Sequence, residues 1–307
     1  MELITGLNDN GRRLDRILRK ALADHPLSLI YRLLREGQVL VDGKPAKGQE
    51  RINSGVKISI PSLNDVQKPK LPPAHSHKLP PPEIIWEGPG LIAVNKPAGL
   101  TVHGPDSLDT IVQSYLTDKL THSLSFKPGP LHRLDKPSSG IVVFSTSLEG
   151  ARLFTSLMKE LSESQDSSAP KVRKTYLAIV EGSLKNEEVW KDELIRDKEK
   201  KKTFVTESCD SEIGKTAVTK VTPLETKGGY SLIQAEITTG RTHQIRVQAA
   251  AHGYPLLGDV KYKEQRIEQK GNKVDFFLHA WKLEFLEYSI EAPLPEVFKD
   301  KIEALFG

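Results

Sequence analysis

The amino-acid sequence predicts an α+β protein with a small N-terminal domain and a larger C-terminal domain. Residues 1–62 contain two amphipathic helical segments and a hairpin, residues 63–82 are rich in proline, and residues 83–307 hold more strand-like than helix-like segments. In the third region strands do not alternate with helices, so we expect a mixed, mainly antiparallel sheet.

The composition is typical of a globular protein, with 37% hydrophobic and 27% charged residues among 307. The single cysteine, Cys209, excludes an internal disulfide and a cysteine-rich zinc site, and it fits a reducing compartment. Because we find no signal peptide and no apolar run of ~18 residues, we expect a cytoplasmic protein without a membrane partner. A monomer is the simplest expectation.

The N-terminal domain carries the surplus of positive charge. Residues 1–62 hold 11 Lys+Arg against 7 Asp+Glu, whereas the remaining residues hold 33 of each, so the net charge of +4 belongs to this region. In the first helix, within residues 11–22, the core positions are Leu14, Ile17, Leu18 and Ala21. In the second, within residues 27–37, they are Ile30, Leu33 and Leu34, with Ser28 as N-cap and Gly37 after the last turn.

Five arginines on the other faces of these helices predict a surface for a phosphate backbone. They are Arg12, Arg16, Arg19, Arg32 and Arg35. An Asp42-Gly43 turn and a strand within residues 55–60 complete this domain. In the proline-rich segment, six of twenty residues are proline, which predicts a linker over residues 63–82.

The C-terminal domain, residues 83–307, shows the mixed pattern that underlies the fold class. We expect a helix over residues 147–161, with Leu153, Leu157 and Leu161 buried, and another over residues 241–253. We expect solvated loops at residues 161–170 and 195–203. The expected strands lie within residues 83–88, 91–96, 140–147, 174–182, 231–240 and 276–286.

The stretch "PLHRLDKPSSG", residues 130–140, places four polar, ionisable side chains beside an apolar strand. A metal site, a general acid or base or nucleophile, and a salt-bridged turn are the three interpretations. The histidines of this domain match no standard ligand spacing, and the chain has no H-E-x-x-H motif, so we expect no metal. G-x-S-x-G, Walker A and G-x-G-x-x-G motifs are also absent, which removes support for serine hydrolase, P-loop and dinucleotide-binding classes.

Asp135 is the remaining chemical candidate. Arg133 and Lys136 lie next to it in sequence and favour its charged form, in which a carboxylate acts as nucleophile or base. Arg241 and Arg246 in "GRTHQIRV" form a second cationic pair, and Thr242 is a candidate cap for the helix that follows.

Four segments in order, "HRLDKPSSGIVVFS", "KTYLAIVEG", "TGRTHQIRVQAAAHGYPLLGD" and "FLHAWKLEF", resemble the pseudouridine synthases of the RluA type. The preceding "LIAVNKPAGLTVH" is similar to the first strand and loop of their catalytic domain, and the N-terminal region resembles the S4 RNA-binding domain. The resemblance covers residues 12–61 and 83–288. It implies the pseudouridine synthase fold, an RNA substrate and no cofactor.

The resemblance also implies a reaction, in which the N1–C1′ bond of uridine breaks, uracil turns, and C5 bonds to C1′. It makes Asp135 the catalytic carboxylate, either as a nucleophile at C1′ or as a base on the ribose. Tyr176 would stack under the base and help to move the C5 proton. Arg241 would pair with Asp135, with Arg246 as the second choice, and Ile245 would contact uracil.

For base extrusion, the resemblance points to Arg133, with His132 beside it, as the side chain that replaces the flipped base. The chain departs from the family at Lys136–Gly140, which reads "KPSSG", and at Gln248, where histidine is usual. Large-subunit ribosomal RNA is the expected substrate. The alternatives are a tRNA-directed synthase and an RNA-binding assembly factor with a vestigial site.

Overall fold

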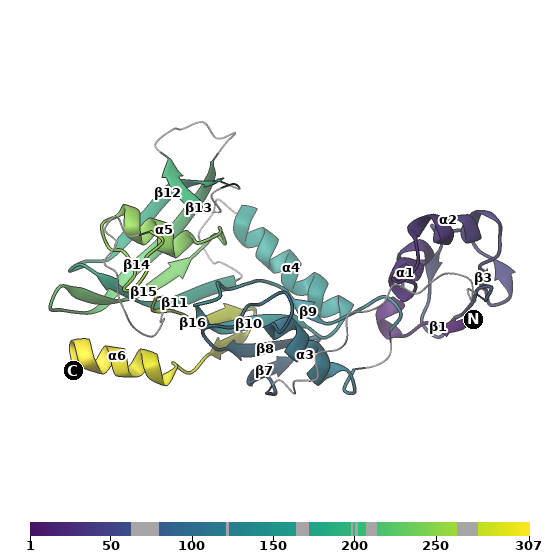
Figure 1. The fold of residues 1–307 in the computed structure, drawn as a ribbon, viewed down its shortest axis with the longest axis horizontal. Coiled ribbons are helices and arrows are strands. Elements are labelled where there is room, and N and C mark those ends of the chain that lie inside the picture. The colour runs from purple at the N-terminus through teal and green to yellow at the C-terminus, as the bar shows by residue number, and fades with distance from the viewer. Residues whose placement is uncertain are drawn as a thin grey trace.

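The structure is a computed structural model that describes residues 1–62, 80–120, 123–163, 172–197, 199, 202–206, 214–262 and 276–307. A small N-terminal part lies at one end of the molecule, and a larger part is built on a long sheet (Figure 1). The proposed linker, residues 63–82, lies mostly outside the described residues, so the domain boundaries stay a prediction.

The N-terminal part is a small α+β unit, as the sequence predicts. Its four-stranded sheet has the order β1-β6-β3-β4, and β2 pairs with β5. Its elements are β1 (Glu2–Ile4), the 3-10 turn η1 (Leu7–Asp9), β2 (Arg12–Arg13), α1 (Leu14–Ala21), α2 (Leu27–Arg35), β3 (Leu40–Val41), β4 (Lys44–Pro45), β5 (Arg51–Ile52) and β6 (Lys57–Ser59).

The core of this part contains most of the predicted helical positions. Five of them are less than 5% exposed, whereas Ala21 and Leu34 are half-buried. The five are Leu14, Ile17, Leu18, Ile30 and Leu33. Gly37 follows α2 with φ +67°, as expected, but the N-cap is Pro26 and not Ser28. Arg12 lies in β2, before the first turn of α1, and is therefore not part of a helical stripe.

The larger part contains an eleven-stranded sheet whose main path is β13-β12-β14-β15-β11-β16-β10-β8-β7. All its pairs are antiparallel except β10 with β16, which confirms the mixed, mainly antiparallel prediction. Its strands are β7 (Ile84–Gly88), β8 (Leu91–Lys96), β9 (Gly129–Pro130), β10 (Ser139–Ser145), β11 (Val172–Glu181), β12 (Glu188–Asp197), β13 (Lys202–Thr206), β14 (Lys215–Lys227), β15 (Tyr230–Ile237), β16 (Leu278–Phe285) and β17 (Tyr288–Glu291).

Alternate residues of the strands point to opposite faces of this sheet, and helices pack against both faces. Ile92 and Val94 of β8 pack with α3 (Leu108–Leu116) and α5 (Gln244–Ala251), whereas Leu91 and Ala93 pack with α4 (Leu148–Glu163). On β11, Leu177 and Ile179 pack with α6 (Glu296–Phe306).

Several elements differ from the prediction. Residues 195–197 belong to β12 and residues 202–206 form β13, although this charged stretch was expected to be a loop. Trp190 and Leu194 anchor β12, whereas Lys191 and Arg196 are exposed, so a partly solvated strand reads as a loop. In α4, Leu153 is 40% exposed and Phe154 is fully buried instead. Residues 161–163 continue α4, and residues 164–170 lie outside the described residues.

Candidate active site

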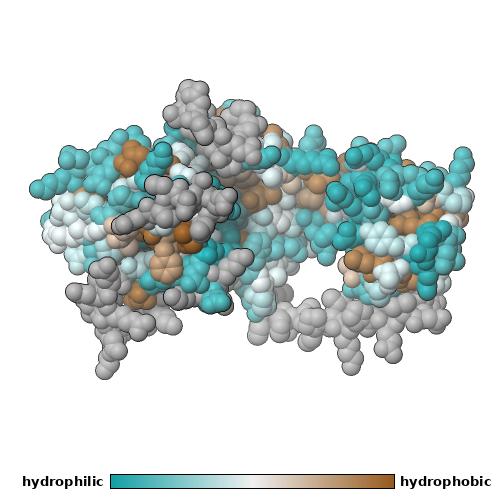
Figure 2. Space-filling model, turned by 90° about the horizontal axis from the view of Figure 1, so that it is seen from above, coloured by the Kyte–Doolittle hydropathy of each residue, from teal (hydrophilic) through white to brown (hydrophobic). Residues whose placement is uncertain are grey.

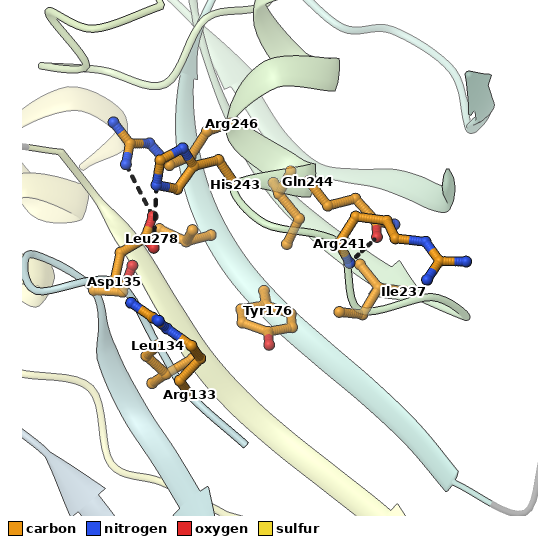
Figure 3. Close-up of a pocket in the computed structure, with 12 residues that line it drawn as sticks. Arg133, Leu134, Asp135, Tyr176, Ile237, Arg241, His243, Gln244, Arg246 and Leu278 are labelled. Carbon is orange, nitrogen blue, oxygen red and sulfur yellow. Dashed lines mark hydrogen bonds and ion pairs between the residues drawn. The ribbon is translucent and has the colours of Figure 1, made fainter. Parts of the chain in front are cut away.

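A pocket lies where the loop before β10 meets β11, the end of β15 and the start of α5 (Figure 3). Both charged and apolar side chains line it. Its lining includes Arg133, Asp135, Tyr176, Ile237, Arg241, His243, Ile245, Arg246 and Leu278. The structure therefore brings together side chains from all four segments of the resemblance, which are spread along the chain from Arg133 to Leu278.

A buried lysine, Lys96, holds the loop that carries Asp135. The ammonium of Lys96, on β8, donates to the carbonyl oxygens of Pro97 at 2.9 Å, Leu100 at 2.8 Å and Lys136 at 3.2 Å. Burial lowers the pKa of Lys96 to about 8, while the charge of Asp135 acts in the opposite direction. Lys96 thereby ties the end of β8 to the residue directly after Asp135.

Asp135 is paired with Arg246, which was the second choice in the sequence analysis. Arg246 Nη1 donates to Asp135 Oδ2 at 2.9 Å. The other two nitrogens of the guanidinium bind Asp259, through Nε to Oδ2 at 2.7 Å and Nη2 to Oδ1 at 2.8 Å. Burial alone would lower the pKa of Arg246, but the two carboxylates raise it, so the group stays charged. Asp259, which is 1% exposed, thus orients the arginine that orients Asp135.

The expected pair between Arg241 and Asp135 is wrong. Arg241 points away from Asp135 in Figure 3, and its Nε donates to the carbonyl oxygen of Thr216 at 3.1 Å. The physical reason is the turn at His243, whose φ of +57° precedes the first residue of α5. Arg246 lies in the first turn of the helix and faces Asp135, whereas Arg241 lies before the turn.

His243 is a site residue that sequence reasoning missed. Its Nε2 lies 3.6 Å from Asp135 Oδ1, and its Nδ1 lies 2.7 Å from the Tyr262 hydroxyl. Burial lowers the pKa of His243, whereas the charge of Asp135 raises it. Its place in "RTHQIR" was the available signal, but the sequence analysis weighed it only as a metal ligand. His243 is also the N-cap residue of α5, so the role considered for Thr242 is wrong.

Tyr176 reaches the pocket from β11. Ala178 and Val180, two and four residues farther along β11, share its face and pack in the same core. Burial and the charge of Asp135 both raise the pKa of Tyr176 well above its ordinary value. The phenol therefore stays protonated at neutral pH. Ile245, 4% exposed, lines the same pocket, and its contact with uracil stays a prediction.

Arg133 and His132 point to different environments. Arg133 is exposed at the pocket and has no hydrogen-bond or ion-pair partner within the described part of the chain. His132 instead accepts a hydrogen bond from the Val143 N–H at 3.1 Å and stacks on Phe154 at 6.2 Å. Burial, assisted by the charge of Lys174, lowers its pKa well below the ordinary value. The ring of His132 therefore packs behind the loop, and its expected part in base flipping stays a prediction.

Gln248, where the family usually has histidine, has a structural role. Its amide nitrogen donates to Asp192 Oδ2 at 2.6 Å and to the Trp190 carbonyl oxygen at 3.1 Å, and its oxygen accepts from Thr219 Oγ1 at 2.6 Å. The side chain is fully buried, so α5 is fastened to β12 and β14 through a satisfied amide.

Neither a metal site nor a membrane span is evident in the described residues. They contain no group of three or more His, Cys, Asp or Glu side chains placed to hold a metal ion. Likewise, none of the helices described is long and apolar enough to cross a membrane.

Comparison with known proteins identifies the family. The model of the RNA pseudouridylate synthase family matches residues 90–251, more than half of the chain, and that of the S4 domain matches residues 12–58. The chain belongs to the RNA pseudouridylate synthase family. This confirms the predicted enzyme class, an isomerase that makes pseudouridine in RNA, and the S4 resemblance.

Curated relatives of this synthase match nearly all of it. It is 30% identical to "Ribosomal large subunit pseudouridine synthase C" of Vibrio vulnificus, over 92% of the chain and 88% of the relative. It is 29% identical to "Uncharacterized RNA pseudouridine synthase YlyB" of Bacillus subtilis, over 99% and 98%. Among solved structures, "Human RNA Pseudouridylate Synthase Domain Containing 4" has the same fold, with a TM-score of 0.59 and 22% identity. The match covers 72% of this chain and 92% of that structure.

The arginines of the S4 domain are divided between its surface and its junction with the synthase domain. Four of them are exposed: Arg16, Arg19, Arg32 and Arg35. Arg12 is half-buried and donates from Nη1 to the carbonyl oxygen of Ser125, at 3.1 Å. Hydrophilic side chains are spread over the S4 domain, at the right of Figure 2.

Proposed function

We propose that the enzyme isomerises specific uridines of large-subunit ribosomal RNA, with Asp135 as the catalytic carboxylate. The observation that carries this proposal is the held geometry of Asp135. Arg246 binds Oδ2 at 2.9 Å, while Oδ1 accepts no hydrogen bond from the described residues and has His243 Nε2 3.6 Å away. One oxygen is therefore fixed and the other is available to the ribose of a flipped uridine.

The neighbouring residues support the same assignment. Either role of Asp135, attack on C1′ or removal of a ribose proton, needs a carboxylate held in a fixed orientation, and the ion pair with Arg246 holds it. Uridine and pseudouridine are isomers, so the reaction needs no external oxidant, reductant or group donor. The uracil that leaves C1′ must turn in place, and the apolar contact with Ile245 leaves it free to rotate.

The raised pKa changes the role we assign to Tyr176. A phenol that remains protonated donates a hydrogen bond or packs against the base, but it does not accept the C5 proton at neutral pH. We therefore assign Tyr176 to holding the uracil during its rotation. Arg133, exposed and unpaired among the described side chains, is available to occupy the space that the extruded base leaves in the RNA.

The ribosomal substrate rests on the relatives. The relative from Vibrio vulnificus carries "Ribosomal large subunit" in its name. So does a relative from Neisseria meningitidis serogroup A, which is 30% identical over 93% of this chain. Pseudouridine mapping by carbodiimide primer extension in a strain that lacks the enzyme tests this. Loss of signals from large-subunit RNA supports the proposal, whereas loss confined to tRNA overturns it.

The catalytic assignment is tested by Asp135→Asn, which keeps the shape of the side chain and removes its charge. Because the amide cannot serve as nucleophile or base, we expect tritium release from [5-³H]uridine RNA to fall by about 10⁴-fold or more. RNA binding should change little. Asp109→Asn, on α3 and outside the pocket lining, is the matched control. Release by Asp135→Asn at the control rate would contradict the assignment.

A further inference from the structure

We infer that Asp9 is a specificity-determining residue, because its carboxylate docks the S4 domain onto the segment that leads to the Asp135 loop. The docking sets one distance and orientation between the exposed arginines and the pocket. The RNA part of this inference rests on the proposed function, whereas the docking is a property of the chain and is measured separately.

The Asp9 carboxylate is fully buried at the end of η1 and is surrounded by donors. Oδ1 accepts from the Ser123 hydroxyl at 2.8 Å and the Ser125 N–H at 2.9 Å, and Oδ2 accepts from the Leu124 N–H at 2.9 Å. The Ser125 hydroxyl donates to Oδ1 as well, and the Gly6 N–H donates to Oδ2 at 2.8 Å. Four of these five donors come from the synthase domain.

The charge of Asp9 survives its burial. Burial alone would raise the pKa of Asp9, but the hydrogen bonds from Ser125, Leu124, Gly6 and Ser123 together lower it below its ordinary value. Hydrogen bonds to an ionised acceptor are stronger than neutral ones. Removal of the carboxylate would also leave several buried donors without an acceptor. Asp9 is therefore the centre of the contact.

Three flanking contacts differ in chemistry and reinforce the docking. The Leu148 N–H, in the first turn of α4, donates to Asn8 Oδ1 at 2.8 Å. Arg12 Nη1 donates to the Ser125 carbonyl oxygen at 3.1 Å. The Leu124 side chain packs against the hydrophobic core of the S4 domain. The synthase domain thus contributes a helix start, a backbone segment and an apolar side chain to one surface.

The docked segment continues directly into the catalytic loop. After Ser125 the chain forms β9, which pairs with β10, and then reaches Arg133 and Asp135. Ser125 precedes Asp135 by only ten residues. Because β9 is hydrogen-bonded to the central sheet, this segment cannot move far relative to the pocket. A domain fixed to it is fixed to the active site.

Positive charge spans the junction that Asp9 holds together. Burial lowers the pKa of Arg12, Asp9 raises it, and both Arg152 of α4 and Arg16 of α1 lower it further. Arginines from the two domains are therefore close enough to repel one another. Phosphates of an RNA backbone that crosses the junction would relieve this repulsion. Such a composite surface exists only while the two domains are docked.

The test compares Asp9→Ala with Asp24→Ala, a control at an exposed aspartate of the same domain. Small-angle X-ray scattering of the full chain measures the docking without RNA. Tritium release measures specificity on two probes: an unmodified large-subunit RNA transcript, and a short hairpin from it that wild type modifies. The hairpin spans the pocket and is too short to reach the S4 arginines.

We expect Asp9→Ala to increase the radius of gyration, because loss of a charged hydrogen-bond acceptor weakens the docking. On the long transcript, kcat/KM should fall about tenfold or more. Its rate on the hairpin should stay within about twofold of wild type, because the pocket is intact. An unchanged radius of gyration, or equal losses on both RNAs, overturns the inference. If wild type modified no large-subunit transcript, so that no such hairpin could be chosen, the ribosomal proposal would be overturned, while scattering would still decide the docking.

Discussion

Arg246 divides its guanidinium between two carboxylates, and this division defines the chemistry of the pocket. Asp259 occupies Nε and Nη2, so only Nη1 is left for Asp135. Stacking on Phe276, with the guanidinium carbon 4.2 Å from the ring centre, restrains the plane of the group. A free arginine could bind both oxygens of Asp135 and cover them. The buried partner at Asp259 prevents this, and one oxygen of Asp135 remains available.

At this scale, Arg246→Lys and Arg241→Lys form a matched pair of variants. Lysine keeps the charge but cannot bridge two carboxylates with a planar fork, so we expect Arg246→Lys to lower the single-turnover rate by about a hundredfold. Arg241→Lys should stay within about threefold of wild type, because the hydrogen bond of the Arg241 side chain among the described residues goes to a backbone carbonyl, that of Thr216. Rapid-quench measurement of tritium release checks both. An equal or larger loss in Arg241→Lys would contradict the pairing seen in the structure.

The pair of β10 and β16 is the element on which the pocket rests. It is the parallel pair of the sheet, and it begins at Ser139, four residues after Asp135. Gly140 approaches the backbone of Ala280 so closely that an added Cβ would lie 2.2 Å from the Ala280 carbonyl oxygen, and its φ is +105°. Buried His279 supports the same place, with Nδ1 2.8 Å from Ser139 Oγ. Ser139 and Gly140 of the "SSG" segment therefore form the contact between β10 and β16.

Gly140→Ala tests this element. The Cβ would meet backbone, which cannot swing aside, so we expect a loss of about 3 kcal/mol or more in the stability of the synthase domain. Gly129→Ala, in β9, is the control, since nothing lies within 4 Å of its added Cβ, and it should cost about 1 kcal/mol or less. Urea unfolding followed by far-UV circular dichroism measures both. Equal stabilities would contradict the close approach of β10 to β16.

At the scale of the whole molecule, the exposed arginines and the pocket lie in separate domains. Arg16 and Arg19 project from α1 into solvent, whereas Arg12 is used at the junction. The basic surface is therefore smaller on α1 than the sequence predicted. With Arg152 of α4 near Arg12, it extends onto the synthase domain instead.

Replacement of Arg16 and Arg19 by alanine measures this surface. Each lost phosphate contact should reduce the slope of log K against log salt by about 0.7–0.9, so the double variant should show a visibly flatter dependence. Lys299→Ala with Lys301→Ala is the control, on α6 at the opposite end of the molecule (Figure 1). Filter binding across a salt series distinguishes them. Equal slopes in wild type and the arginine variant would show that these side chains are merely solvated.

The fold class, the S4 resemblance, the enzyme family and the motif that holds Asp135 followed from the sequence, because hydrophobic periodicity and local motifs are properties of neighbouring residues. Tertiary structure alone decided which arginine meets Asp135. The left-handed turn at His243 separates Arg241 from Arg246, and spacing does not reveal such a turn. Tertiary structure also decided the direction of the His132 ring, which stacks on Phe154. The contact of Asp9 with Ser125 joins residues 116 positions apart, beyond the range of any local pattern.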